Sequence, residues 1–483
     1  MNQEIEPVSR LSSAMFIGLI VILLLTNLLF GVASNGGMGL TAVLFVPLVI
    51  FWVADSLFHH KLSFSDNWLQ IPLIGMIVIG LIQLLPLGGD AEAGELLQVP
   101  VSGALTIIPF ATKLAVFKLV MFLIFFAAAL VYIDSPYRMR TVAFALIIYG
   151  AVISFIGILQ QLSNPSWVLW IRQVDYATPF ATYVNRHHFA AFLLMTISVT
   201  LGLLFAGSTK PDKRLLLVIA ACLMGFGIVF TSSRGALISL IALLGMLTAL
   251  SFLSGRKIDS KRRKKNFFSR VWILVGANAV LVIFLLISVA WIGGSDISLR
   301  SAGLTESADF SNGRVDFWAN TLKIIRDNPI LGTGLDTFEV AYTRYDTWNG
   351  QLRVNHAHNE YLHVFSEAGI LGLLCVFGFI FLLFRQGLKI INSTLHPFRR
   401  GLAAGALAGC FGIMVHSFFD FPLRTNANMF CFLILATLAT ARVEFPVLIR
   451  RRKKIKEIVV EPKSDADDFG DESDDSDHLL GDG

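Results

Sequence analysis

The chain alternates between long apolar runs and short polar connections along almost its whole length. A helix needs roughly 20 apolar residues to span a bilayer. Runs of about this length lie near residues 13–33, 38–54, 68–87, 113–133, 140–160, 187–206, 214–230, 235–253, 271–292, 368–386, 400–419 and 427–446. The first run is longer than the ~7–15 apolar residues of a signal peptide, and more runs follow it. The pattern predicts an all-α polytopic membrane protein with about 12 transmembrane helices.

The composition leaves little room for soluble domains. Hydrophobic residues make up 55% of the 483 residues and charged residues only 15%, whereas about 25% of a typical soluble domain is charged. The cysteines all lie inside apolar runs, at Cys222, Cys375, Cys410 and Cys431. Their position predicts residues that pack between membrane helices and excludes a disulfide-based scaffold.

Lysine and arginine are concentrated in a subset of the polar connections. The connection 254–270 carries eight basic residues, and further basic loops lie at 138–140, 210–214, 399–400 and 450–454. Basic loops stay on the cytoplasmic side of a membrane. Twelve spans with both termini in the cytoplasm put all five basic loops on that side.

Two segments stand apart from the spans and short loops. Residues 461–483 hold ten Asp and Glu and one Lys, so we expect a disordered acidic tail in the cytoplasm after a transmembrane domain of residues 1–460. The external segment 293–367 is the longest connection. Within it, RVDFWANTLKIIRD from Arg314 has apolar residues at helical spacing and follows a potential cap at Asn312. We expect one or two amphipathic helices over the external mouth of the bundle.

Several arginines lie in predicted external loops, where the bias against translocated positive charge should deplete them. In TSSRG, Ser232 or Ser233 can cap the next helix and place Arg234 in its first turn. In SNGRVDFW, Arg314 would also begin a helix. An arginine at a helix N-terminus suits a phosphate. The alternatives are an interfacial side chain reaching for water and an ordinary surface arginine.

Histidines cluster in two of the external segments. NHAHNEYL places His356, His358, Asn359 and Glu360 just before a span, and a neutral histidine is a natural general base. His-x-His is also half of a metal site, but the remaining ligands are not evident, so we expect no metal. YVNRHHF offers polar contacts for a ligand or an interfacial belt, through Asn185, Arg186, His187 and His188. In DFPLRTN we expect an ion pair between Asp420 and Arg424 that stabilises a turn.

These motifs together resemble a known family. SRG at the start of a span, NGR-x-x-x-W opening a helix, NPILGTG and then HAHNEYLHVFSEAGILG are similar to the O-antigen ligase and polymerase superfamily of bacterial inner-membrane glycosyltransferases, over roughly residues 183–435. The resemblance implies about twelve helices with a long periplasmic loop. It also implies transfer of a glycan from undecaprenyl diphosphate to an acceptor hydroxyl on the periplasmic face, without a metal ion or other cofactor.

The resemblance also implies roles for individual residues. Arg234 and Arg314 would hold the lipid diphosphate, and His358 would be the catalytic histidine, with His356 as an additional candidate. We expect Glu360 or Asn359 to orient His358. Supporting positions would be Asn185, Arg186, His188, Asn359 and Glu360, whereas Tyr361 and Glu367 match the family pattern and are expected to be structural.

Other functions remain open at this point. A polysaccharide or lipid transporter, or a flippase without catalytic activity, would need charged groups near the membrane midplane, whereas here they gather on one face. An assembly scaffold would not need the external arginines and histidines. The acceptor could be another glycan, the lipid A core or a protein hydroxyl. Besides the lipid bilayer and the lipid-linked donor, no nucleic-acid partner is expected.

Overall fold

The structure is a computed structural model that describes residues 9–29, 35–60, 63–87, 103–174, 177–255, 276, 314–347 and 353–445. These residues belong to a compact unit, Met1–Phe445. The predicted acidic tail 461–483, the basic loop 256–270 and the predicted cap Asn312 lie outside the described residues. The predicted span 271–292 also lies outside them, apart from Gly276.

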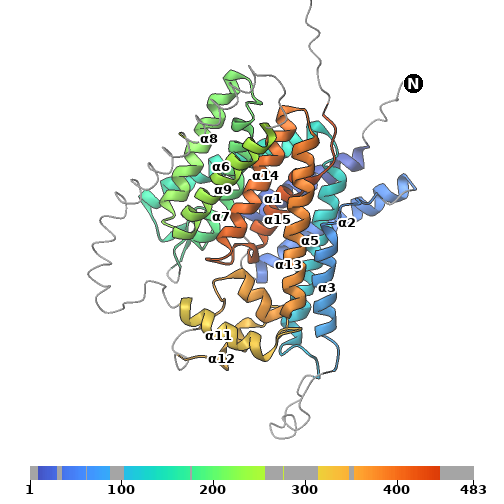
Figure 1. Ribbon diagram of the computed structural model, residues 1–483, viewed down its shortest axis with the longest axis vertical. Coiled ribbons are helices and arrows are strands. Elements are labelled where there is room, and N and C mark those ends of the chain that lie inside the picture. The colour runs from blue at the N-terminus through green and yellow to red at the C-terminus, as the bar shows by residue number, and fades with distance from the viewer. Residues whose placement is uncertain are drawn as a thin grey trace, which may run out of the picture. The chain divides into compact units, whose positions relative to one another are not determined.

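The described part of the chain is almost entirely helical, which confirms the predicted all-α membrane fold (Figure 1). The helices long and apolar enough to cross a membrane are α1 (Arg10–Leu28), α2 (Asn35–Phe58), α5 (Pro109–Tyr132), α6 (Pro136–Ser163), α7 (Arg186–Phe205), α8 (Pro211–Phe230), α9 (Arg234–Gly255), α13 (Glu360–Ser393) and α14 (Pro397–His416). Two shorter apolar helices are α3 (Gln70–Gln83) and α15 (Asn426–Thr440). Eleven of the twelve predicted spans therefore correspond to described helices.

The chain marks the starts of several helices by its sequence. Pro109, Pro136, Pro211 and Pro397 each occupy the first turn of their helix, where the missing N–H of proline costs no hydrogen bond. Of the four cysteines, all within the described residues, Cys410 and Cys431 are buried as predicted, Cys375 is half-buried, and Cys222 is exposed.

Helices α7 and α14 cross at very short range in the middle of the bundle (Figure 1). A Cβ atom added to Gly202 would lie 2.5 Å from the Cα atom of Gly405 and 2.5 Å from the carbonyl oxygen of Gly401. Only residues without a side chain permit this approach, a common way for membrane helices to pack. The close contact joins the end of α7 to the start of α14, and the histidines discussed below lie at the opposite ends of the two antiparallel helices.

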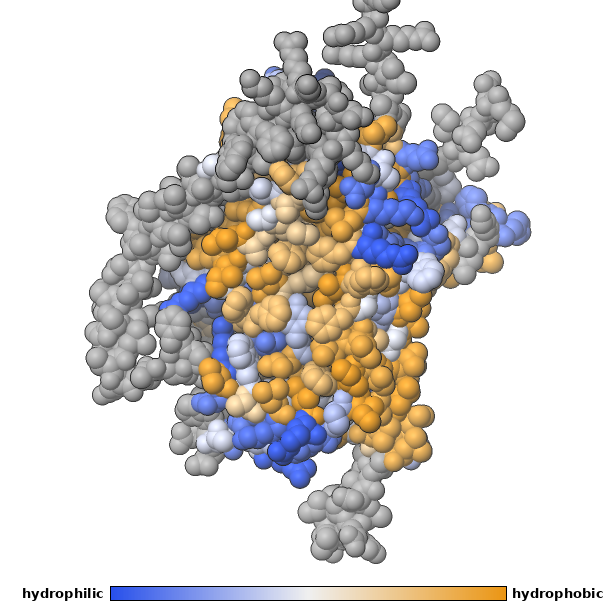
Figure 2. All heavy atoms as spheres, viewed as in Figure 1, coloured by the Kyte–Doolittle hydropathy of each residue, from blue (hydrophilic) through white to orange (hydrophobic). Residues whose placement is uncertain are grey.

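The segment predicted as a long external loop contains the expected amphipathic helices. α11 (Arg314–Asp327) begins at Arg314 as predicted, and α12 (Phe338–Thr343) follows it. The indole nitrogen of Trp318 donates a hydrogen bond to the carbonyl oxygen of Ala357, 3.0 Å away, which ties α11 to the segment before α13. Figure 2 shows apolar side chains over much of the visible face, with hydrophilic ones at the end where α11 and α12 lie and a second hydrophilic group at the upper right of the view.

The predicted loop boundary at residue 367 lies just before a kink in α13, the element that begins at Glu360. The backbone leaves helical geometry at Gly369, where φ is +62°. A Cβ atom there would lie 2.0 Å from the carbonyl oxygen of Ile330, so only glycine fits. The NPILGTG segment thus docks against α13 at this break. Other short elements are β1 (Trp167–Val168), β2 (Arg172–Gln173), which pairs antiparallel with β1, and the 3₁₀ helix η2 (Pro422–Arg424).

Candidate functional site

The starts of α7, α9 and α13 meet the end of α14. The imidazole Nδ1 of His187 in α7 lies 2.8 Å from the hydroxyl of Ser233, which precedes α9. The ring Nε2 of His416, at the end of α14, lies 3.3 Å from the carbonyl oxygen of His187. The N–H of Glu360, the first residue of α13, donates to the carbonyl oxygen of Ser417. Three helix N-termini therefore point their partial positive charge toward one region.

His358 and Asp420 form the central pair of this region. The Nδ1 atom of His358 lies 3.5 Å from a carboxylate oxygen of Asp420. The Asp420 side chain is 3% exposed, whereas the His358 side chain is 34% exposed. Burial alone would raise the pKa of Asp420, but the nearby imidazole of His358 holds that pKa below its usual range. The carboxylate is therefore ionised and can orient the partly exposed imidazole.

The backbone at His358 is held in an unusual conformation. Its φ is +51°, in the left-handed region that few non-glycine residues adopt. Its ring stacks on Phe317 of α11, with centroids 6.2 Å apart, and meets Phe421 edge-on at 5.1 Å. Strained residues of this kind concentrate at binding and catalytic sites. The two aromatic contacts and Asp420 together fix the position of the ring.

The prediction that Asn359 or Glu360 orients His358 is wrong. The Asn359 side chain caps α13, where it accepts hydrogen bonds from the N–H groups of Tyr361 and Leu362 at 3.1 and 3.2 Å. Glu360 lies 3.3 Å from Arg424 instead. Both side chains thus have other partners, which leaves His358 to a partner distant in sequence.

The two arginines expected at the diphosphate come close to the same region. Arg314 is half-buried at the start of α11, and its positive charge acts on His416. Arg234 is exposed at the start of α9, and the predicted cap is present because Ser233 accepts a hydrogen bond from the N–H of Ala236. A Cβ atom on Gly235 would lie 3.2 Å from Nδ1 of His416. Both arginine-bearing helix starts thus lie beside His416, four residues before Asp420.

The three predicted residues around the start of α7, Asn185, Arg186 and His188, have different environments. Asn185 caps α7 by accepting from the N–H of His187. His188 is buried, with Nδ1 2.8 Å from the Thr425 hydroxyl. Arg186 lines a separate small cavity with Gln161, Pro179 and Phe230. His188 therefore lies among the residues that surround Asp420, whereas Arg186 lines the other cavity.

His356 also contacts Phe421, the ring that His358 meets edge-on. Its ring centroid is 3.9 Å from that of Phe421, and it lines a cavity of about 620 Å³. Burial lowers the pKa of His356 to about 2, so the ring is uncharged at neutral pH. His356 is thus a wall of a pocket, and His358 is the more exposed imidazole.

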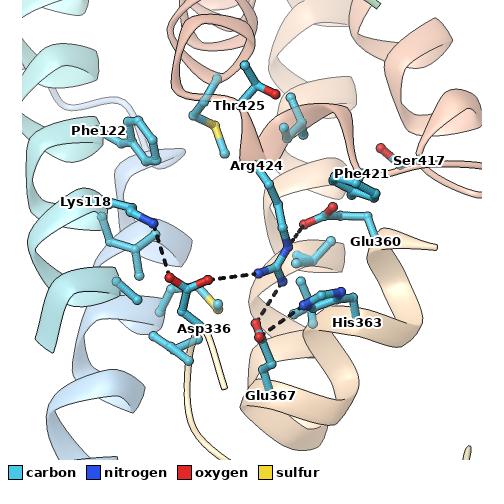
Figure 3. A pocket seen from close by; sticks show the side chains of 18 of the residues that line it. Lys118, Phe122, Asp336, Glu360, His363, Glu367, Ser417, Phe421, Arg424 and Thr425 are labelled. Atoms are coloured by element: carbon cyan, nitrogen blue, oxygen red, sulfur yellow. Dashed lines mark hydrogen bonds and ion pairs between the residues drawn. The ribbon is translucent and has the colours of Figure 1, made fainter. Parts of the chain in front are cut away.

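The predicted ion pair between Asp420 and Arg424 is also wrong. Arg424, in η2, lies 2.8 Å from Glu367, 3.3 Å from Glu360 and 3.8 Å from Asp336 (Figure 3). These three carboxylates attract the guanidinium and raise the pKa of Arg424, although burial opposes them. Glu367, expected to be structural, is 2% exposed and joins Arg424 to His363 of α13. Asp420 is left free to pair with His358.

Sequence reasoning missed His416 and assigned Asp420 the wrong partner. His416 lies four residues before Asp420 at the external end of a predicted span, and this spacing was a usable signal. Asp336, with φ +61° and a contact to Lys118 at 3.2 Å, gave no local signal. Within the described residues, no group of three His, Cys, Asp or Glu side chains could hold a metal ion.

The fold and the site define a polytopic helical membrane protein in which arginines, histidines and one buried carboxylate gather where several helices start. The O-antigen ligase family model matches residues 219–377. An O-antigen ligase of Pseudomonas aeruginosa is 28% identical over 297 residues, which cover 59% of this chain. The chain spans 62% of the length of that relative. These matches support the O-antigen ligase and polymerase superfamily for this chain, as the motifs predicted. The matched family region contains Arg234, Arg314 and His358.

Proposed function

We propose that the protein transfers a glycan from an undecaprenyl diphosphate carrier to an acceptor hydroxyl, in the biosynthesis of a surface polysaccharide. We further propose that it does so on the periplasmic face of the bacterial inner membrane, with both termini in the cytoplasm. The observation that carries the proposal is the pairing of the partly exposed His358 with the buried carboxylate of Asp420, beside two helix starts that carry arginines.

His358 is the general base in this reaction. Its Nδ1 atom faces Asp420, so the proton on Nδ1 is held by the carboxylate and the lone pair of Nε2 is available. Nε2 takes the proton of the acceptor hydroxyl as the oxygen attacks the anomeric carbon. Asp420 then stabilises the imidazolium that forms. General-base assistance of this kind contributes roughly 10²–10⁴-fold to a rate.

The donor supplies the leaving group. As the new carbon–oxygen bond forms, the bond between the anomeric carbon and the phosphate oxygen breaks, and undecaprenyl diphosphate departs with the electron pair. Negative charge then grows on the phosphate oxygens. Arg234 and Arg314, each at a helix N-terminus, stabilise that charge electrostatically. Direct displacement inverts the anomeric centre.

A transporter or flippase function receives less support. Alternating access uses charged groups near the membrane midplane, often at broken helices. Here His187, His358, His416 and Asp420 lie at or beyond the ends of α7, α13 and α14. Such a position suits chemistry at the membrane surface.

The experiment is reconstitution of the purified protein in liposomes with an undecaprenyl-diphosphate-linked glycan and a hydroxyl-bearing acceptor. The expected result is a covalent product with inverted anomeric configuration and the release of undecaprenyl diphosphate. A donor that crosses the bilayer with its glycosidic phosphate bond intact would instead support the transporter function.

A further inference from the structure

The cavity beside His356 is amphipathic, and we call it the acidic pocket. It occupies about 620 Å³ between α3, α5, α13 and α15. Its apolar wall comes from membrane helices and includes Leu73, Leu119, Phe379 and Phe432. Its polar end holds Lys118, Asp336, Glu360, Glu367 and Arg424 (Figure 3). A ligand that fits both parts has a polar head and an apolar chain.

The cations in the acidic pocket are already engaged. Arg424 contacts three carboxylates, and Lys118 lies 3.2 Å from Asp336. A phosphate at this position would have to displace buried acidic side chains and lie beside them. Leaving a buried charge without its partner is strongly unfavourable. The charge distribution therefore disfavours an anionic head group.

Two imidazoles offer the pocket unused hydrogen-bonding atoms. His188 is 8% exposed and lines the pocket, and its Nε2 atom is buried without a hydrogen-bond partner. The Nδ1 atom of His356, which also lines the pocket, is likewise unpartnered. A buried polar atom is normally satisfied. A hydroxyl group can both donate to and accept from a neutral imidazole, so sugar hydroxyls would satisfy these atoms.

We propose that the acidic pocket binds the acceptor, as an amphiphile with an uncharged, hydroxyl-rich head and an apolar chain. This inference rests on the proposed glycan transfer. Phe421 lines the pocket, and its ring contacts His356, His188 and His358 at 3.9, 5.0 and 5.1 Å between ring centroids. The pocket lining therefore reaches a residue that contacts His358, which would place a hydroxyl of the acceptor head near that imidazole. The donor diphosphate and the acceptor would thus approach His358 from differently charged sides.

The test uses full-length protein in nanodiscs, purified without a glycosidic detergent. The probe is a dodecyl maltoside with a photoreactive diazirine in its chain, and the comparison probe is dodecyl phosphate with the same chain. After irradiation, mass spectrometry maps the labelled residues. We expect the maltoside to label residues of the acidic pocket at least tenfold more efficiently than the phosphate. Equal or stronger labelling of the pocket by the phosphate would overturn the inference.

Two neighbouring positions on α3 provide a matched pair of variants. Leu73 lines the pocket, whereas Ile74 is 43% exposed and points away from it. We expect Leu73→Trp to reduce maltoside labelling at least tenfold and Ile74→Trp to leave it unchanged. Ala115→Trp, on the α5 wall, is a second blocking variant if Leu73→Trp does not fold. Unchanged labelling in a folded blocking variant would contradict the inference.

The same variants separate this inference from the proposed function. Arg314→Ala should reduce glycan transfer but leave maltoside labelling intact, because Arg314 lies outside the lining of the pocket. Loss of labelling by an undecaprenyl diphosphate probe in Leu73→Trp, with no maltoside labelling in wild type, would assign the pocket to the donor. That outcome would overturn the acceptor assignment while glycan transfer stands.

Discussion

Arginines serve opposite purposes in two neighbouring regions of this protein. Around His358, Arg234 and Arg314 begin helices beside a group of histidines, and His358 contacts the buried carboxylate of Asp420. In the acidic pocket, Arg424 is surrounded by three carboxylates. We propose that the first arrangement holds an anionic ligand, whereas in the second the carboxylates neutralise the cation. The chemistry of an external arginine is therefore decided by its partners, not by its side of the membrane.

The largest expected effect is on the stability of the acidic pocket. Arg424→Ala leaves Glu367, which is 2% exposed, without its cation, so we expect a loss of about 3–5 kcal/mol of stability. Thermal unfolding of the purified variant in detergent measures this loss. Arg442→Ala is the matched control, because the ion pair of Arg442 with Asp66 is exposed. Equal unfolding temperatures for the two variants would contradict the claim that Arg424 neutralises buried carboxylates.

Arg314→Ala tests whether the arginines near His358 bind the diphosphate of the donor. Removing one preorganised positive group from a developing charge costs roughly 10²–10³-fold in rate, and we expect a loss of that size in glycan transfer. Arg326→Ala is a control on the same helix, because Arg326 is 76% exposed at the far end of α11. The transfer rate is measured as a function of the donor concentration. A loss that depends only on the acceptor would argue against a contact with the diphosphate.

Asp420→Asn tests whether the buried carboxylate acts as a positioning residue for His358. The amide keeps the size of the side chain but removes the charge that stabilises an imidazolium at His358. We expect kcat to fall by about one to two orders of magnitude while KM for the donor stays within a factor of about three. Steady-state kinetics with the lipid-linked donor separates the two constants. A rise in KM with unchanged kcat would indicate that Asp420 serves binding.

The smallest expected effect concerns Asn359. Because its side chain caps α13, Asn359→Ala should cost about 1 kcal/mol of stability. Asn359→Asp retains a capping oxygen and should recover most of the loss. Chemical denaturation of the three proteins measures the difference. A large loss of transfer activity at unchanged stability, in both variants, would show that Asn359 takes part in the reaction after all.

Most of the helices could be predicted from the sequence. Apolar runs located eleven described helices, and RVDFWANTLKIIRD located α11 because its apolar periodicity and its terminal charges agree. The cap at Asn359 was also readable, since asparagine before Glu360 is a preferred N-cap. The partners of the charged residues were not readable. His358 and Asp420 are 62 positions apart, and their loops meet because the start of α13 lies against the end of α14, where the N–H of Glu360 donates to the carbonyl oxygen of Ser417.

Replacement of His358 tests the central claim most directly. Transfer of glycan from undecaprenyl diphosphate in proteoliposomes should fall by about 10²–10⁴-fold in His358→Ala, because the acceptor hydroxyl loses its base. His396→Ala should retain the wild-type rate, since His396 lies at the opposite end of α14. Full transfer activity in a folded His358→Ala protein would contradict the account.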